Sequence, residues 1–304
     1  MTILPSENVV FDDTPVARTG RLAVLRRRTD FIGKAARNPL MFLGSTILLL
    51  LLFMALLAPF LGTVDPSAIS PAERTREPSA AHWFGTDMLG RDLYSRVIYG
   101  ARISLLVGFT VAIVASAIGL AIGLISGFMR RLDGVVMRVM DGIMSVPPIL
   151  LAIALMALTR GSVYNVIIAI SIAEVPRVAR LVRGVVLSLR ETTYVEAALA
   201  GGSRTSTILL RHILPNTLAP MTVQATYICA SAMVIESILS FIGAGTPPTI
   251  PSWGNIMAEG RALWQVKPYI VLFPAAFLSL TVLAVNLLGD GLRDAIDPRM
   301  ATRT

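Results

Sequence analysis

The chain has 304 residues, of which 54% are hydrophobic and only 15% are charged, and its formal net charge is +8. Length alone would suggest about two soluble domains. However, the mean hydropathy is +0.70, and charge-free runs long enough for a helix that crosses a bilayer core of about 30 Å recur along the chain. These properties exclude an ordinary soluble protein and predict an all-α polytopic membrane protein.

The positive charge is concentrated in places that indicate a topology rather than nucleic-acid binding. Seven basic residues precede the first apolar run: Arg18, Arg21, Arg26, Arg27, Arg28, Lys34 and Arg37. This enrichment predicts that residues 1–40 form a cytoplasmic tail, because loops rich in Lys and Arg stay on the cytoplasmic side. A cleaved signal peptide is the alternative, but its apolar core of roughly 7–15 residues is shorter than this run.

Six membrane-spanning helices are expected within residues 41–290. Their predicted ranges are about 41–61, 103–128, 138–158, 163–183, 216–240 and 268–289. The fourth is apolar only up to Ala173, and it is inferred because the basic cluster from Arg177 to Arg211 belongs on the cytoplasmic side. Six spans place both termini in the cytoplasm, including a C-terminal tail over 291–304.

The region between the fourth and fifth spans, about 186–215, has the pattern of a helix, a glycine turn and a second helix. Thr193 and Glu196 have the spacing of a capping box. Gly201-Gly202 is expected to end the first helix, because glycine adopts the left-handed conformation at little steric cost. Ser203 is a candidate cap for the second helix, and Pro215 suits the first turn of the next span. These residues alone leave open a surface hairpin with no partner.

Part of this region, EAALAGGSRTSTILLRHILPN, resembles the EAA loop of ABC-importer permeases. The matching positions are Glu196, Ala197, Ala198, Gly202, Leu214 and Pro215, with Gly201 beside the matching glycine. His212 stands where the family has Ile, with Ile213 next to it.

Four further blocks resemble the dipeptide/oligopeptide/nickel branch of that family. They are FGTDMLGRDLYSRVIYGARISLLVG (84–108), RLVRGVVLSLRETTYVEAA (180–198), IESILSFIGAGTPPTIPSWGNIMAEG (235–260) and NLLGDGLRDAIDPR (286–299). The extended segment after the first span is similar to the C-type, second permease subunit. Two departures are the Glu174-Val-Pro run, where the family more often has an aromatic residue, and LAGGS in place of a commoner RALGAS.

The resemblance implies a type I ABC-importer permease fold in a bacterial or archaeal plasma membrane. The expected partners are a second homologous permease, one or two ABC ATPase subunits, an extracytoplasmic substrate-binding protein and membrane lipid, without nucleic acid. The EAA loop would couple the permease to the ATPases. Peptides are the first expectation for the cargo, and nickel chelates, opines and oligosaccharides are alternatives.

The sequence predicts a transport subunit and not an enzyme. It contains no G-x-x-x-x-G-K-[ST] phosphate loop, so ATP and Mg²⁺ are expected on the partner subunits and no cofactor on this chain. A single cysteine, Cys229, and two distant histidines, His82 and His212, argue against a metal site. A proton-coupled secondary transporter is the distant alternative, with Glu174, Glu236 and Asp141 as its intramembrane ionisable candidates.

Three local patterns carry weaker expectations. Gly119, Gly123 and Gly127 lie four residues apart and predict close packing of two helices. Pro147-Pro148 marks either a kink or a helix start. The stretch 91–102 reads as an amphipathic helix lying at the outer membrane face, and TPPTIPSW (246–253) as either a docking loop or a rigid connector.

Overall fold

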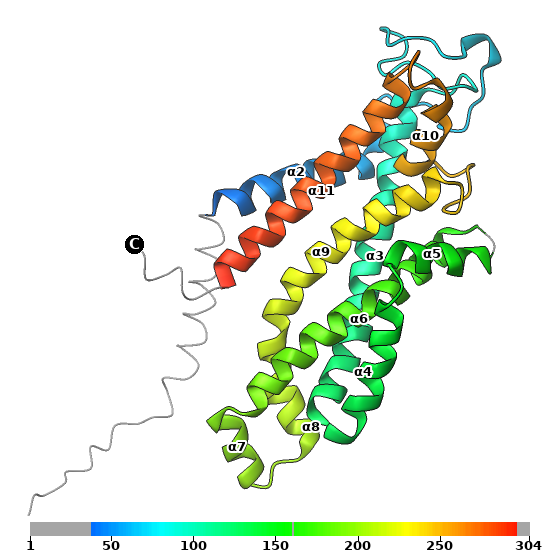
Figure 1. Ribbon diagram of the computed structural model, residues 1–304. Helices are drawn as coiled ribbons and strands as arrows, with labels where there is room; N and C mark the ends of the chain where they lie inside the picture. The colour runs from blue at the N-terminus through cyan, green and yellow to red at the C-terminus, as the bar shows by residue number, and fades with distance from the viewer. Residues whose placement is uncertain (1–37, 160, 297–304) are drawn as a thin grey trace, which may run out of the picture.

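The computed structural model describes residues 38–159 and 161–296, and within these ranges the regular structure is helical apart from one isolated bridge between Thr86 and Asp92, with turns and loops between the helices (Figure 1). Residues 1–37 of the first predicted tail, with all seven of its basic residues, lie outside these ranges, and so do residues 297–304 of the second; residues 291–296, predicted as tail, belong to the last helix. The helices are α2 (Pro39–Leu56), η1 (Ala58–Phe60), η2 (Pro71–Glu73), α3 (Leu93–Phe128), α4 (Arg130–Met144), α5 (Pro148–Ala157), α6 (Val163–Arg190), α7 (Thr193–Ala200), α8 (Thr205–Ile208), η3 (Leu209–Ile213), α9 (Leu214–Phe241), α10 (Trp253–Gly260), η4 (Arg261–Leu263) and α11 (Tyr269–Ile296).

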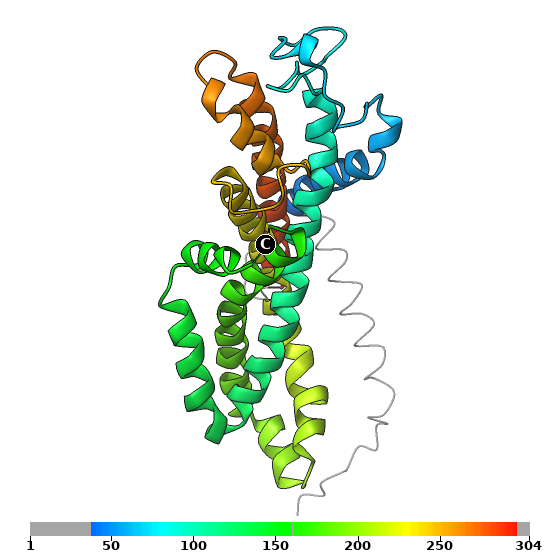
Figure 2. The ribbon, with the colours of Figure 1, turned by 90° about the vertical axis from the view of Figure 1, so that its right-hand side faces the viewer.

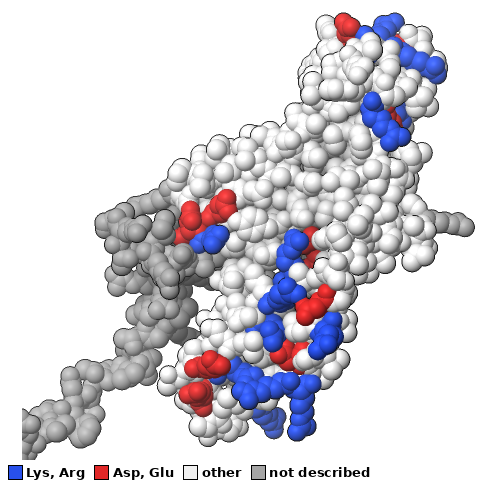
Figure 3. Space-filling model, viewed as in Figure 1, with Lys and Arg blue, Asp and Glu red and all other residues white. Residues whose placement is uncertain are grey.

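The long helices form one elongated bundle, with α3 packed between α6 and α9 (Figures 1 and 2). α11 packs against α9, and α2 packs against α11 and α3. One end of the bundle carries the segment 57–92 together with α10, and the opposite end carries α7 and α8. On the face shown in Figure 3, charged side chains gather at the end that carries 57–92 and α10, beside the C-terminal end of α11, and over the half of the bundle nearer to α7 and α8; a broad charge-free surface separates the first group from the other two.

Four of the described helices are long and apolar enough to cross a membrane: α2, α3, the helical run through α9 and α11. The pair α4 and α5 also passes this test when it is treated as one broken span. The helix α6 occupies the predicted fourth span with 28 residues, about 42 Å at 1.5 Å per residue. From Glu174 onward it also carries Arg177, Arg180 and Arg183, so it is not apolar throughout, and the count of six spans stays a prediction.

The span predicted at 138–158 is not one straight helix. α4 and α5 meet at 84° across the short break at 145–147. Pro148 disfavours the helical conformation of the residue before it, and Pro147 accordingly has an extended backbone, with φ −53° and ψ 135°. The two prolines therefore both break the helix and start a new one.

The helix α3 starts ten residues before its predicted beginning. Asp92 caps it by accepting a hydrogen bond from the Ser95 amide at 2.8 Å. The predicted helix over 91–102 is confirmed from Leu93 onward, but Leu93 and Val97 are completely buried in the bundle, so its predicted position at the membrane face is wrong. Trp253 of α10 donates its indole N–H to the Val97 carbonyl at 3.0 Å, which ties α10 to this end of α3.

Charged residues enter this buried region because they neutralise one another. Asp87 accepts from Arg91 Nε at 2.6 Å and also pairs with Arg96. Arg96 donates to Glu259 of α10, with Nη2 and Oε1 3.0 Å apart. Burial raises the pKa of the Asp87 carboxyl, but Arg96, Arg91 and two backbone N–H donors outweigh it, so this pKa lies below its ordinary value of 3.8. The predicted span was drawn as a charge-free run and therefore began only after Arg102, so it missed this buried pairing.

The close packing of α3 on α6 follows the predicted glycine pattern. A Cβ atom added at Gly119, Gly123 or Gly127 would come within 2.5–2.7 Å of a valine Cβ on α6, and the valines concerned are Val178, Val182 and Val186. Only glycine allows the two backbones to approach this closely. Both helices run in the same direction, and each glycine meets the valine one turn further along.

A buried polar network holds the connection from α9 to α10. Ser240 donates to Glu236, which is completely buried, and also contacts Thr246. Asn255 of α10 donates to the carbonyls of Thr246, Pro247 and Ile250 at 2.9–3.3 Å. The TPPTIPSW segment is therefore fixed against the bundle by hydrogen bonds.

We expect Gly123→Ala to destabilise the protein by about 1–3 kcal/mol, because the added methyl group overpacks the contact with Val182. Thermal unfolding in detergent should show a lowered midpoint, and Val182→Ala in the same chain should restore part of it. Gly134→Ala in α4 is the control, because nothing lies within 4 Å of a Cβ at that position. Equal midpoints for Gly123→Ala and the parent chain would contradict the packing account.

Asp87→Asn should lower the free energy of unfolding by about 3–5 kcal/mol, because it leaves buried arginines without a carboxylate. Since the pKa of folded Asp87 is depressed, its contribution is present above pH 3.8 and disappears as the pH falls below that value. Limited proteolysis of the segment 57–92 provides the readout. Glu77→Gln breaks the exposed pair with Lys267 and should leave the cleavage rate nearly unchanged; equal rates for the two variants would refute the assignment.

Candidate functional site

The segment between α6 and α9 forms a helical hairpin that projects from one end of the bundle (Figure 1). We call residues 191–213 the α7–α8 hairpin. All seven residues singled out by sequence lie in it or at its root: Glu196, Ala197, Ala198, Gly201, Gly202, Leu214 and Pro215. α6 continues to Arg190, so the first residues of the predicted loop at 186 still belong to that helix.

The predicted capping box at the start of α7 does not form. Thr192, not Thr193, is the N-cap residue, and no side chain caps the helix. The Thr192 hydroxyl donates back to the Leu189 carbonyl at the end of α6. The box fails because Thr192 already marks the end of the preceding helix, which shifts the frame by one residue. Glu196 therefore lies exposed in the first turn of α7 and makes no capping contact.

The glycine turn matches its sequence prediction. α7 ends at Ala200, and Gly202 has φ +74°. The Ser203 amide donates to the Ala198 carbonyl and the Gly202 amide to the Leu199 carbonyl, both at 3.0 Å. This pair of hydrogen bonds is a Schellman motif, which closes the helix end and fixes the direction of the chain that follows.

The second limb of the hairpin starts without the predicted serine cap. Arg204 is the N-cap residue of α8, and its side chain makes no capping bond, so the assignment of Ser203 as the cap is wrong. After α8 the chain makes one π-helical turn, η3, and then enters α9, with Pro215 in the first turn. The proline has no N–H to give to the preceding turn, which suits this irregular junction.

Three buried side chains attach the hairpin to the bundle. Val195 of α7, Ile208 of α8 and Ile213 of η3 are completely buried. The Tyr194 ring also lies 6.2 Å from the His212 ring, which links the two limbs. Sequence reasoning missed these anchors because the π turn separates Ile208 from Ile213 by five residues, which breaks the usual helical spacing.

The side of the hairpin that does not pack on the bundle is exposed. Glu196, Ala197 and all residues from Leu199 to Thr207 are exposed, and so are Leu210 and Arg211. Leu199 exposes 47% of its surface and Leu210 63%. Two large apolar side chains beside charged groups, on a segment held rigidly from behind, are the composition of a surface that binds a protein partner.

Paired charges reinforce the bundle just above the hairpin. Arg183 of α6 forms a two-pronged pair with Asp133 of α4, at 2.5 and 2.6 Å. One turn earlier, Arg180 pairs with Asp141. Arg190 donates to two carbonyls at the end of α3, at 3.4 Å each. The basic cluster that indicated topology thus also fixes α4 and α3 to α6.

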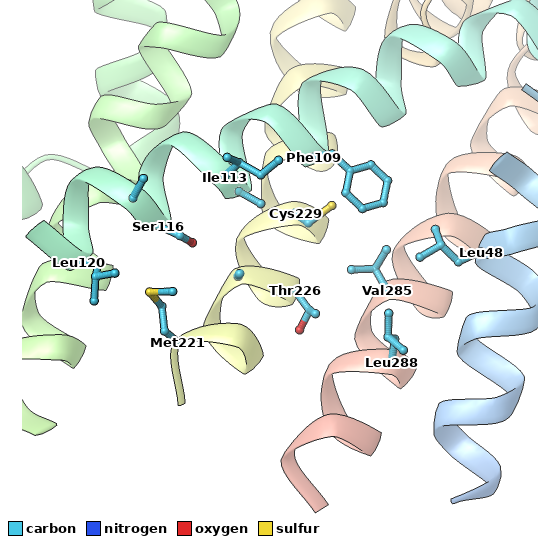
Figure 4. A pocket seen from close by; sticks show the side chains of 13 residues that line it. Leu48, Phe109, Ile113, Ser116, Leu120, Met221, Thr226, Cys229, Val285 and Leu288 are labelled. Carbon is cyan, nitrogen blue, oxygen red and sulfur yellow. The ribbon is translucent and has the colours of Figure 1, made fainter. Parts of the chain in front are cut away.

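An apolar groove of about 440 Å³ lies between α2, α3, α9 and α11 (Figure 4). Phe109, Ile113, Met221 and Val285 are among its lining residues, and the groove exposes no polar atom. Such a surface gives a charged or polar solute no hydrogen-bonding partner. Among the described residues, no group of three His, Cys, Asp or Glu side chains is arranged to hold a metal ion.

Two family models match the chain. Residues 118–302 match "binding-protein-dependent transport system inner membrane component", and residues 29–78 match "N-terminal TM domain of oligopeptide transport permease C". The first match contains the whole α7–α8 hairpin.

Curated relatives and solved structures agree with these matches. The chain is 54% identical to a probable peptide ABC transporter permease of Sinorhizobium fredii over 88% of this chain and 92% of the relative. It is 43% identical to the dipeptide transport system permease DppC of Alkalihalophilus pseudofirmus, over 87% of each chain. The inward-facing methionine ABC transporter MetNI contains a similarly folded chain, with a TM-score of 0.57 and 20% identity over 66% of this chain and 97% of that one.

The left-handed turn gives a prediction that separates hairpin geometry from side-chain bulk. Gly202→Val should loosen the hairpin, because a β-branched residue disfavours positive φ, whereas Gly202→Asn should preserve it. No atom lies within 4 Å of a Cβ at this position, so a simple clash cannot explain a difference. Hydrogen exchange of the amides in 195–209 should accelerate in the valine variant alone. Equal exchange in both variants would contradict the proposed role of the turn.

Proposed function

The chain belongs to the binding-protein-dependent transport family of inner membrane permease components, in the C-type branch of peptide importers, and from this premise we propose that its α7–α8 hairpin is the coupling element that the ATPase subunits move. The protein is a multi-pass permease subunit of an ATP-driven importer. The finer assignments below concern this chain's own residues, its partners and its cargo.

The observation that carries the proposal is a rigid, exposed hairpin with a free apolar face. Val195, Ile208 and Ile213 hold it from behind, and the Schellman turn fixes its two limbs. A push on Glu196 or Leu199 is therefore transmitted to α6 and α9, which continue directly from the hairpin. Small shifts at such a site become rigid-body helix movements because packed cores do not deform continuously.

The distribution of charge supports the orientation that this role needs. The basic residues of α4 and the hairpin, and those of α6 that follow Arg177, lie toward the hairpin end of the bundle (Figure 3), which we place in the cytoplasm by the positive-inside rule. The chain begins and ends on the same side under this assignment. The segment 57–92 and α10 then face the outside, where a substrate-binding protein would dock.

Energy would come from partner subunits. The sequence has no phosphate loop, so we assign ATP and Mg²⁺ to one or two ABC ATPase subunits and no cofactor to this chain. A second homologous permease would supply the other half of the solute path. Peptides are the proposed cargo, because several relatives are described as peptide or dipeptide permeases; nickel chelates, opines and oligosaccharides remain the other classes to test.

The three ionisable candidates for proton coupling all have partners in the structure. Glu174 pairs with Arg177, Asp141 with Arg180, and Glu236 accepts from Ser240. Groups engaged in this way favour a structural role over a proton relay. We therefore do not carry a secondary transporter forward as a second function.

Glu196→Lys should abolish ATP-driven uptake while the membrane level of the chain stays normal. Glu196 is exposed and makes no capping contact. The substitution therefore changes the free energy of folding by only about 0.3–1 kcal/mol, through the interaction of the side-chain charge with the helix dipole. A large loss of uptake must then arise at a partner. The measurement is peptide uptake by the complete transporter in proteoliposomes, together with copurification of the ATPase subunits.

Glu191→Lys is the matched control, because it makes the same charge change at an exposed residue between α6 and α7. It should retain uptake. If Glu196→Lys transports and copurifies like the parent, the hairpin is not the coupling element. If Glu191→Lys loses uptake to the same extent, the loss results from the charge change and not from its position, which would also count against the assignment of Glu196.

A further inference from the structure

An ion pair lies deep in the membrane-crossing part of α6. Glu174 is completely buried, and its Oε2 atom lies 3.0 Å from Arg177 Nη1. The packing of Gly119 against Val178 repeats every turn along α3 and α6. Extending this register by one turn places Glu174 beside Ala115, close to the middle of the charge-free stretch 103–129 of α3. The pair therefore lies near the centre of the bilayer.

One member of this pair faces outward. Arg177 exposes 45% of its side chain. Charged groups at this depth almost always face the bundle interior or a water-filled cavity, because their exposure to lipid is costly. Ile172, two residues before Glu174, is exposed on a different side of α6 and has the apolar character that lipid requires. The two sides of α6 at this depth therefore face different surroundings.

A polar hollow continues this surface on the neighbouring helices. Ser231 of α9 donates to Glu174 Oε1 at 3.2 Å. Ser231 also lines a cavity of about 310 Å³ between α9 and α11, together with Tyr227, Asn286 and four apolar residues. The Tyr227 hydroxyl donates to Asp290 of α11. This hollow differs from the apolar groove of Figure 4, which exposes no polar atom.

The break between α4 and α5 borders the same side of α6. Arg180, one turn after Arg177, pairs with Asp141, one turn before the break at 145–147. The break residues are exposed in this chain. Irregular backbone at membrane depth is tolerated only where protein covers it or where it lines a water-filled cavity.

We propose that the surface formed by Arg177, Ser231, Tyr227 and Asn286, backed by Glu174, is this chain's wall of the solute path. The inference rests on the proposed transport function and adds the residues that face the solute. The wall offers a fixed guanidinium and hydrogen-bonding groups at mid-depth, so it suits a polar or charged solute. Glu174 acts as a positioning residue, because it orients Arg177 and Ser231 and is itself shielded from the path.

Cysteine accessibility in the complete transporter tests this assignment. Cys229 is the chain's one cysteine, so Cys229→Ala provides the parent, and single cysteines are introduced as Ser231→Cys, Arg177→Cys and Ile172→Cys. The probe is the anionic, membrane-impermeant reagent sulfonatoethyl methanethiosulfonate, applied to the reconstituted complex with and without ATP. Only a hydrated thiol ionises and meets this reagent, so Ser231→Cys and Arg177→Cys should react about tenfold faster than Ile172→Cys, or more.

The rate of modification at position 231, compared with position 172, decides the proposal. Fast modification at 231, with loss of uptake and continued ATP hydrolysis, supports the wall. Equal rates at 172 and 231, or no reaction at 231, overturn it; Ser231→Cys decides alone if Arg177→Cys fails to insert. Labelling does not require transport, so if the Ser231→Cys chain labels as expected while the cysteine-free parent complex takes up no peptide, the result counts against the transport function and leaves the surface assignment intact.

Discussion

The close contact between α3 and α6 is the constraint on which the other features of the structure depend. Gly119, Gly123 and Gly127 let the valines of α6 reach the α3 backbone, and this fixes both the height and the rotation of α6. Arg180 and Arg183, nearer the hairpin end of α6, then pair with Asp141 and Asp133 of α4. Lipid provides no hydrophobic drive for helices to associate, so backbone proximity and paired charges must supply the contact.

The rotation of α6 also determines what its two ends can do. One exposed side of α6 is apolar at Ile172. A different side carries Arg177, which pairs with the buried Glu174. The lower end leads without a flexible linker into α7, whose Val195 returns to the core. A movement imposed on the hairpin is thus passed along the same helix that carries the polar surface near the membrane centre. Under the proposed function, this continuity is what connects an event at the hairpin with a change of access near the membrane centre.

Sequence predicted the helical class, the glycine contacts, the turn at Gly202 and the position of the α7–α8 hairpin, because each of these follows from local chemistry. It did not predict the early start of α3, since the buried pairing of Asp87 with Arg96 depends on residues brought together by folding. The capping box at Thr193 failed because Thr192 closes α6 first. The two prolines marked the break between α4 and α5, but a local sequence pattern does not determine its angle of 84°. The hairpin anchors were hidden by the π turn of η3.

The central claim is that the α7–α8 hairpin lies against an ATPase subunit, and site-directed photo-crosslinking measures this contact most directly. A benzophenone side chain replaces Leu199, which is exposed on the free face of the hairpin, in the assembled transporter. The same group replaces Val266 at the opposite end as a control, where 72% of the residue is exposed. The account predicts a crosslink from 199, and none from 266, to an ATP-binding subunit. A hairpin that crosslinks only to lipid, or as weakly as position 266, would contradict it.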